Sequence, residues 1–164
     1  MTSPEFARIR DAGYLDTSFE GKETHRLTIE ALSKEEAIAR YKQSGGKTWV
    51  WDEIEKNMPY TTPKAKTLDV IMMNFGKNIK SDEAIAEMDK LGVRPLTAEE
   101  LIQYGIANPS HQEKDLLVGL SSKHTLDGSP LAVILRVSVD RRDLVAGHWG
   151  GDWNDGYRFP VVRK

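Results

Sequence analysis

The stretch Leu131-Ala-Val-Ile-Leu-Arg-Val-Ser-Val139 decides the fold more clearly than any other part of the chain. Successive side chains of a β-strand point to opposite faces, so residues two apart share a face. The odd-numbered positions here are all aliphatic, whereas the even-numbered positions become polar toward the end. This alternation predicts a strand over residues 131–139 with its aliphatic face in a core. The aliphatic face consists of Leu131, Val133, Leu135, Val137 and Val139, and the other of Ala132, Ile134, Arg136 and Ser138.

Four other segments carry strand patterns. One alternates between apolar and polar residues, one is apolar on both faces, as in the middle of a sheet, and two flank the stretch above in sequence. Asp127-Gly128 supplies the turn chemistry of a hairpin loop, which is expected over residues 123–130. In the same order, the four predicted strands are residues 25–30, 67–75, 116–121 and 157–163.

Helices are predicted from their start signals. Ser33 with Glu36 and Thr97 with Glu100 have the spacing of a capping box, in which each side chain accepts a hydrogen bond from the backbone N–H of the other residue. Serine also precedes two other helical patterns. These helices are expected over residues 3–13 and 81–91, with Ser3 and Ser81 as their caps.

Strand and helix patterns occur in separate blocks along the chain. The predicted class is therefore α+β, with a mixed or antiparallel sheet and two to four helices. A length of 164 residues suits a single domain, 1–164, and the alternative is a division into an N-terminal segment, 1–62, and a C-terminal half, 67–164. Trp49 and Trp51 lie two residues apart, so a strand at this point would carry both rings on one face.

Composition narrows the function classes. The apolar fraction of 39% and the charged fraction of 29% are typical of a globular domain. A net charge of −2 gives no bulk field for holding nucleic acid, so no nucleic-acid partner is expected. The absence of cysteine excludes thiol catalysis and cysteine-ligated metals. Because neither a membrane-spanning run nor a signal-peptide pattern is present in the sequence, no membrane partner is expected and the default localisation is cytoplasmic.

The C-terminal run, residues 148–159, concentrates aromatic, acidic and glycine residues. Aromatic rings provide large and stiff contact areas, and neighbouring polar oxygens fix the orientation of a ligand. The alternative is that both tryptophans fill the core, but Gly150-Gly151 interrupts a continuous strand, so at least one ring is expected at the surface. The candidate ligand-binding residues are Trp149, Asp152, Trp153, Asn154, Tyr157 and Arg158.

Two charged segments elsewhere have competing interpretations. Gly45-Gly46-Lys47-Thr48 contains Gly-Lys-Thr, but Tyr41 stands where a phosphate-binding loop needs glycine, so no such loop is expected. Arg141-Arg142 lies between Asp140 and Asp143. This pattern predicts a solvated turn, with an anion-binding site as the alternative.

Two motifs resemble those of the formylglycine-generating-enzyme branch of the C-type-lectin-like fold. Leu91-Gly-Val-Arg-Pro-Leu-Thr-Ala-Glu-Glu-Leu101 resembles its Gly-x-Arg-Leu-Pro-Thr-x-x-Glu-Trp signature, and Gly156-Tyr-Arg-Phe-Pro-Val-Val-Arg163 resembles its closing Gly-Phe-Arg-x-x-Arg strand. Residues 81–164 are also similar to uncharacterised bacterial proteins that share an Arg-Pro-x-Thr-x-x-Glu-Leu-Leu helix. The resemblance implies a C-type-lectin-like C-terminal half. It implies no activity, because the catalytic cysteines of the enzymes are missing.

The same resemblance bears on metal binding. Trp153-Asn154-Asp155 stands where C-type lectins carry a Trp-Asn-Asp motif that ligates calcium and sugar hydroxyls. It implies Asn154 and Asp155 as calcium ligands, and their side-chain oxygens suit this cation. The companion Glu-Pro-Asn loop and the disulfides of that family are absent. No cofactor is therefore expected, with calcium as the alternative.

The sequence as a whole predicts a non-catalytic binding module for a protein or another macromolecule, with the C-terminal run as its recognition surface. One alternative is a small hydrolase-type enzyme that uses His148 or His111 with Asp152 as an acid–base pair. Another is a self-associating protein that forms a homodimer. The four histidines show no metal-ligand spacing.

Overall fold

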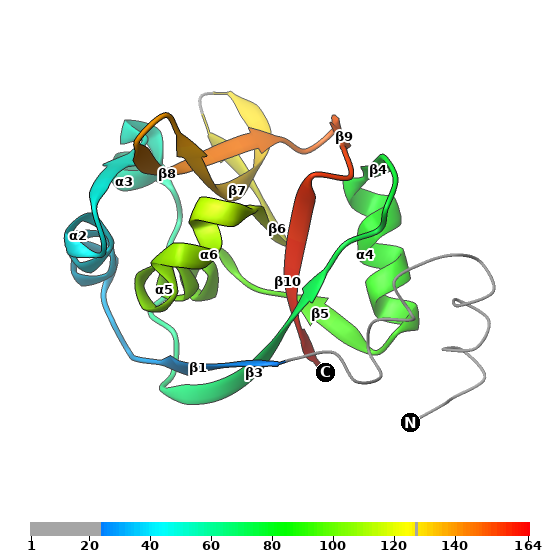
Figure 1. Ribbon diagram of the computed structural model, residues 1–164, viewed down its shortest axis with the longest axis horizontal. Helices are drawn as coiled ribbons and strands as arrows, with labels where there is room; N and C mark the ends of the chain where they lie inside the picture. Colours follow the sequence, from blue (N-terminus) through cyan, green and yellow to red (C-terminus); the bar gives the residue numbers. More distant parts are fainter. Residues whose placement is uncertain (1–23, 127) are drawn as a thin grey trace.

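The computed structural model describes residues 24–126 and 128–164, in which a mixed sheet is covered by helices on both faces (Figure 1). The helix expected over residues 3–13 lies outside the described residues. The strands are β1 (His25–Ile29), β2 (Lys47–Val50), β3 (Lys66–Met73), β4 (Ile79–Lys80), β5 (Val93–Pro95), β6 (Leu116–Leu126), β7 (Ser129–Ser138), β8 (Arg141–His148), β9 (Asp152–Trp153) and β10 (Tyr157–Arg163). The helices are α2 (Lys34–Gln43), α3 (Asp52–Asn57), α4 (Ser81–Lys90), α5 (Ala98–Ala107) and α6 (Pro109–Lys114).

The main sheet has the strand order β1-β3-β10-β6-β7-β8-β2, with β5 paired to β10 beside this path. β10 runs parallel to β6, and β2 runs parallel to β8, whereas the other pairs are antiparallel. A separate ribbon joins β4 to β9. The α+β class and the mixed sheet are confirmed, but the described residues hold five helices instead of the two to four expected.

The alternating stretch predicted as a strand over residues 131–139 belongs to β7, which pairs with β6 on one side and β8 on the other. It is shifted slightly from the predicted 131–139, because Val139 belongs to the turn into β8. Both of its faces are buried over the first half: Leu131, Val133 and Leu135 face one core, and Ala132 and Ile134 face another. The sheet therefore separates two hydrophobic cores.

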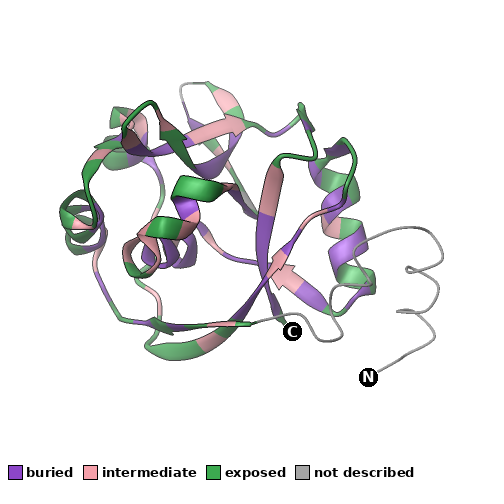
Figure 2. Cartoon of the chain, in the orientation of Figure 1, coloured by how far each residue is buried: buried purple, intermediate pink, exposed green. Residues whose placement is uncertain are grey.

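The two cores are closed by different helices. α2, α3 and α5 contribute residues such as Tyr41, Ile54 and Leu101 to the first core, and α4 contributes Ala84 and Met88 to the second. In Figure 1, α2 and α5 accordingly lie on one side of β10 and α4 on the other. Figure 2 shows buried positions along β10 and on one side of α4 and α5. Burial of these apolar side chains is the main force that holds the helices to the sheet.

Both capping boxes are confirmed. The Ser33 hydroxyl accepts a hydrogen bond from the Glu36 backbone N–H at 3.2 Å, and the Glu36 carboxylate accepts one from the Ser33 N–H. Thr97 and Glu100 make the same pair of bonds at the start of α5. The cap predicted at Ser81 is wrong, because Lys80 precedes α4 and the Ser81 side chain is used elsewhere.

Two strand limits differ from the prediction. β6 continues to Leu126, so the expected loop over residues 123–130 is reduced to the short connection before Ser129. β2 ends at Val50, and Trp51 turns inward at the start of α3, where it packs against both cores. Trp49 stays on the strand and is 36% exposed. The two rings therefore do not share a strand face, because the strand ends between them.

Candidate functional site

The two tryptophans of the C-terminal run are buried. Trp149 is 8% exposed and Trp153 is 3% exposed, so the expectation that at least one ring reaches the surface is wrong. Ser81 explains much of this, because its hydroxyl donates to the Trp149 carbonyl at 2.7 Å and accepts from the Trp153 indole at 2.8 Å. The Trp149 indole donates to Asp82. Buried indole N–H groups need such partners, and α4 supplies them.

Close packing holds the Trp153 ring against the sheet. A side chain at Gly147 would lie 2.6 Å from Ile134 and 3.1 Å from Trp153, so glycine provides the space for the ring. The Tyr157 ring meets Trp153 edge to face, with 5.1 Å between centroids. The aromatic residues of the run therefore close the second core. This is the alternative that the sequence left open.

The polar members of the run lie nearer the surface and have partners within the chain. Asp152 forms an ion pair with Lys80 at 3.0 Å. The Asn154 side-chain oxygen accepts a hydrogen bond from the Gly156 backbone, and Arg158 donates to the Asp155 carbonyl. These contacts fix the turn before β10. The role of this run in ligand binding stays a prediction.

The calcium alternative lacks a supporting arrangement of ligands. Within residues 24–126 and 128–164, no three His, Cys, Asp or Glu side chains come together in a way that could hold a metal ion. Asn154 also uses its oxygen locally. Calcium binding by Asn154 and Asp155 stays a prediction.

The histidines proposed for acid–base chemistry have other neighbours. The Nδ1 atom of His111 lies 2.6 Å from the Tyr104 hydroxyl, and its ring lies against that of His25, with centroids 4.7 Å apart. His148 ends β8, and the ion-pair partner of Asp152 is Lys80. The contacts of the described residues therefore do not join either histidine to Asp152. The acid–base pair stays a prediction without geometric support.

The strand register brings a different group of side chains together at the β7–β8–β2 end of the sheet. Arg136, Asp143 and Trp49 are aligned across the three strands, and Ser138, Arg141 and Lys47 form the next row. Residues directly opposite each other in a sheet share a face. We call these six residues the sheet-end platform. In Figure 1, the β7–β8 hairpin lies at the top, far from β1 and β3.

Asp143 is the centre of this platform. It has no exposed surface, and the Nε atoms of Arg141 and Arg136 donate to its two carboxylate oxygens at 2.7 and 3.4 Å. The guanidinium groups themselves reach solvent, since about half of each side chain is exposed. Two cations are therefore held side by side by one buried anion. The terminal nitrogens of Arg136 have no hydrogen-bond partner among the described residues.

Apolar surface lies beside these charges. The Arg141 guanidinium stacks on the Trp49 ring, with 4.9 Å from its central carbon to the ring centroid. Across the described part of the chain, the exposed large hydrophobic residues are Trp49, Val137 and Val139. Trp49 lies on the platform face, Val139 at the hairpin tip, and Val137 on the opposite face at the same end of the sheet. Grouped exposed apolar residues beside charged ones are typical of interaction surfaces.

The turn at the hairpin tip is strained. Val139 is 99% exposed and has φ of 57°, a region that a β-branched residue rarely adopts. A positive φ at the first of two turn residues fits a type II′ hairpin, which normally has glycine there. Strain of this kind costs on the order of 1–3 kcal/mol and is concentrated at functional sites. An exposed valine in this position gains nothing from burial, so stability does not explain it.

Arg142 supports the platform from the opposite face of β8. It is 3% exposed, which contradicts the solvated turn predicted for Arg141-Arg142. Its nitrogens donate at 2.7 Å to the carbonyl of Ser44, the C-cap of α2, and to that of Gly105 in the last turn of α5, and also to Gln112 on α6. Helix C-termini carry partial negative charge and favour a cation there. Burial lowers the pKa of Arg142.

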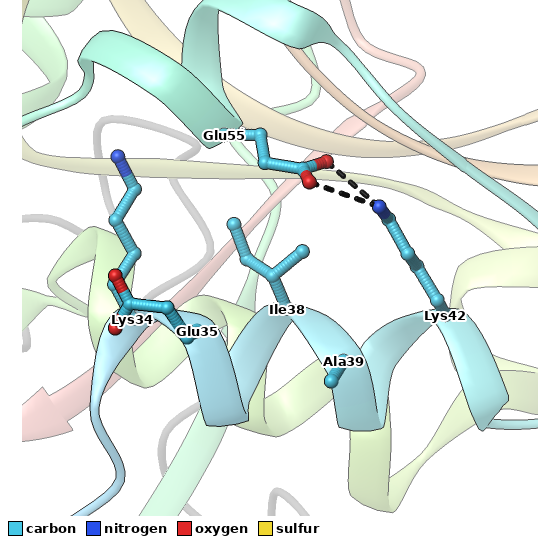
Figure 3. A pocket seen from close by; sticks show the side chains of 6 residues that line it. All are labelled: Lys34, Glu35, Ile38, Ala39, Lys42 and Glu55. Atoms are coloured by element: carbon cyan, nitrogen blue, oxygen red, sulfur yellow. Dashed lines mark hydrogen bonds and ion pairs between the residues drawn. The ribbon is translucent and has the colours of Figure 1, made fainter.

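The remaining hollows offer less chemistry. One of about 210 Å³ lies between α2 and α3 (Figure 3), where Lys42 and Glu55 form an ion pair at 2.8 Å. Lys34, on its rim, donates to the Met58 carbonyl, and burial lowers the pKa of this lysine. Both lysines that line this hollow, Lys34 and Lys42, therefore already have partners within the chain. A larger one, of about 430 Å³, lies between α4 and β5.

The chain matches no protein family model, and no curated protein or solved structure matches it. The resemblance to the C-type-lectin-like fold therefore stays a prediction. Among the helices of the described residues, none combines the length and apolarity needed to cross a bilayer.

The platform was missed in the sequence because β8 was not predicted. The charged run from Asp140 to Asp143 indicated a turn, although only Val139 and Asp140 form it. The usable signal was alternation: Arg141, Asp143 and Val145 share one face of β8 with Gly147. Extending the strand upstream would have placed Arg141 and Asp143 beside Arg136.

Proposed function

We propose that this protein is a non-catalytic interaction module that binds a segment of a partner protein on the sheet-end platform. The observation that carries the proposal is the exposure of Trp49 on the platform, against the Arg141 guanidinium. Val139 is exposed at the adjoining hairpin tip, and Val137 is exposed on the opposite face of the same end of the sheet. This moves the recognition surface expected from the sequence away from the C-terminal run, whose tryptophans are buried.

The neighbouring elements suit a surface of this kind. β2 ends the strand order of the sheet, so one of its sides has no strand partner among the described residues. Exposed sheet edges accept extended peptide segments through main-chain hydrogen bonds. Lys47 on this strand pairs with Asp140 and keeps a charge at the edge, a common device against uncontrolled edge-to-edge pairing. A hollow of about 170 Å³ lies beside the hairpin tip, and Val137 and Val139 are among the residues that line it.

The rigidity of the platform also supports binding. Asp143, Arg141 and Arg142 connect β8 to its neighbouring strand and to three helices. A surface that is ordered before binding loses less conformational entropy when a ligand arrives. Trp49 is an amphipathic ring of the type that dominates binding hot spots.

Selection from a random peptide display library tests this proposal. Peptides enriched on the wild-type protein are expected to lose binding to Trp49→Ala, while binding to Arg26→Gln is retained. Arg26 is a matched surface control, because it lies on β1 at the opposite edge of the sheet and its ion-pair partner among the described residues is Asp69. Thermal unfolding of both variants confirms that they are folded. Enriched peptides that bind Trp49→Ala as well as the wild type would overturn the proposal.

A further inference from the structure

We infer that the partner segment is acidic, and that the paired guanidinium groups of Arg136 and Arg141 bind its Asp or Glu carboxylates. This inference rests on the proposed function and names the chemistry recognised at the same platform. It starts from Asp143, whose carboxylate fixes both arginines.

The geometry leaves donors available. Arg141 uses Nε and Nη2 on the two oxygens of Asp143, at 2.7 and 3.5 Å, and Arg136 uses only Nε. Arginine presents five N–H donors in a planar fork that matches a carboxylate. Among the described residues, nothing accepts from Nη1 of Arg141 or from either terminal nitrogen of Arg136. Two forks therefore remain partly open toward solvent on one sheet face.

The charge balance favours an anion with a single charge. Asp143 neutralises one of the two guanidinium groups, which leaves the cluster with the charge of one cation, while the whole chain carries −2. Lys47 adds little, because Asp140 pairs with it. A carboxylate completes this balance, whereas a phosphate dianion exceeds it. A single-stranded nucleic acid needs a groove of cations that follows its backbone, which a cluster of this size does not provide.

Trp49 extends the site with apolar area. The Arg141 guanidinium is held against the Trp49 ring, which limits the rotamers of the arginine. Trp49 as a residue stays 36% exposed, so part of its surface is open to a ligand. In an extended peptide, residues two apart lie on the same side. A segment in which acidic and aliphatic residues alternate therefore directs all its acidic side chains to the platform face, toward the arginines and Trp49, and all its aliphatic side chains to the other face.

The test uses two acetylated peptides, one alternating Glu and Val and the other alternating Gln and Val. NMR of the labelled full-length protein follows the Nε–H signals of Arg136 and Arg141 and the indole signal of Trp49 during titration. The Glu peptide is expected to bind about tenfold tighter than the Gln peptide, in line with hydrogen bonds to a charged group. This preference is expected to vanish in Arg141→Gln and Arg136→Gln and to persist in Arg26→Gln.

Asp143→Asn separates positioning from charge. Removing the carboxylate makes the cluster more positive, so simple attraction would tighten binding of the Glu peptide. If Asp143 holds the arginines in place, binding weakens despite the added charge, and this is the result we expect. The substitution keeps the shape of the side chain, and the unfolding temperature shows whether the variant is folded. Tighter binding by Asp143→Asn would overturn the arrangement.

The outcomes distinguish this inference from the proposed function. Equal affinity for both peptides, with shifts at Trp49, would overturn the acidic preference and keep the interaction surface. No shift at Trp49 or the arginines with either peptide would overturn both. If inorganic phosphate or an oligothymidylate binds the arginines more tightly than the Glu peptide, the preferred ligand of the arginines is that anion, and the inference of an acidic peptide segment is overturned.

Discussion

Replacing Arg142 by methionine keeps much of the side-chain volume but removes the charge and every donor. In the wild-type protein the guanidinium donates to the Gly105 carbonyl and to the Gln112 side chain in fully buried positions, and to the Ser44 carbonyl at the end of α2. Its central carbon also lies 5.0 Å from the centroid of the Tyr41 ring. The substitution therefore removes the side-chain links from β8 to the ends of α2 and α5, while Gln112 on α6 still donates to the Asp143 carbonyl of β8.

The magnitude follows from the acceptors left behind. A buried acceptor without a donor costs about 1–3 kcal/mol, and the Gly105 carbonyl loses its charged donor in a buried position. The partly buried carbonyls of Ser44 and Gly45 lose theirs as well, whereas the Gln112 oxygen still accepts from the Tyr41 hydroxyl. Part of this is offset, because the buried charge and its desolvation cost are also removed. We expect Arg142→Met to lower the free energy of unfolding by about 3 kcal/mol. For a chain of this size this corresponds to a decrease of about 6–12 °C in the unfolding temperature.

Urea unfolding followed by circular dichroism measures this change, and Arg26→Met is the control. Arg26 lies on β1, where its exposed ion pair to Asp69 contributes about 1 kcal/mol or less. The two variants are thus expected to differ by about 2 kcal/mol. Equal destabilisation by both substitutions would refute the assignment of Arg142 as the buried link between the helices and β8.

Three further predictions concern single groups. Burial would raise the pKa of Glu100, but hydrogen bonds from Arg94 and Lys66 outweigh it and lower the pKa to about 2. Above pH ~4.5 this carboxylate should therefore contribute about 3 kcal/mol to the free energy of unfolding, and the contribution should be lost as the pH falls toward 2. Urea unfolding at several pH values measures this contribution, which should be absent in Glu100→Gln. Burial lowers the pKa of His124, whose Nε2 is buried without a partner in the described residues. The wild-type protein should therefore lose stability as the pH falls below about 6.5, whereas His124→Leu should not lose it and should be more stable by about 1 kcal/mol. The same pH dependence in both proteins would contradict the lowered pKa of His124. Val139→Gly should raise the unfolding free energy by about 0.5–1 kcal/mol, because relief of the positive φ exceeds the entropy cost of glycine, and a decrease would show that the turn is not strained.

Local signals in the sequence predicted the elements that depend on local physics. The capping boxes at Ser33 and Thr97 and the strand β7 were found, because hydrogen bonds and side-chain alternation within a few residues define them. β8 was not predicted, since its charged start resembles a turn. The charge of Arg142 on β8 is stabilised by the carbonyls of Gly105 and Ser44, which are distant in sequence, so no local pattern predicts these contacts.

The burial of the two C-terminal tryptophans was missed for the same reason. The C-terminal tryptophans have the composition of a recognition surface, but Ser81 and Asp82, which precede them by about 70 residues, accept the hydrogen bonds of their indole groups in the second core. Gly147 provides the space for Trp153 on the sheet. Conversely, Trp49 and Arg141 become neighbours only through the pairing of β2 with β8. Strand order is a long-range property, and it decides which aromatic residues are exposed.

We propose the sheet-end platform as the binding surface of this protein. The most direct test of this proposal is the dissociation constant, by titration calorimetry, of a peptide selected on the wild-type protein, measured for the wild type, Trp49→Ala and Arg26→Gln. We predict that Trp49→Ala weakens binding about tenfold or more, as expected for an aromatic hot spot, and that Arg26→Gln leaves it unchanged. Equal dissociation constants for all three proteins, with Trp49→Ala folded, would contradict the claim.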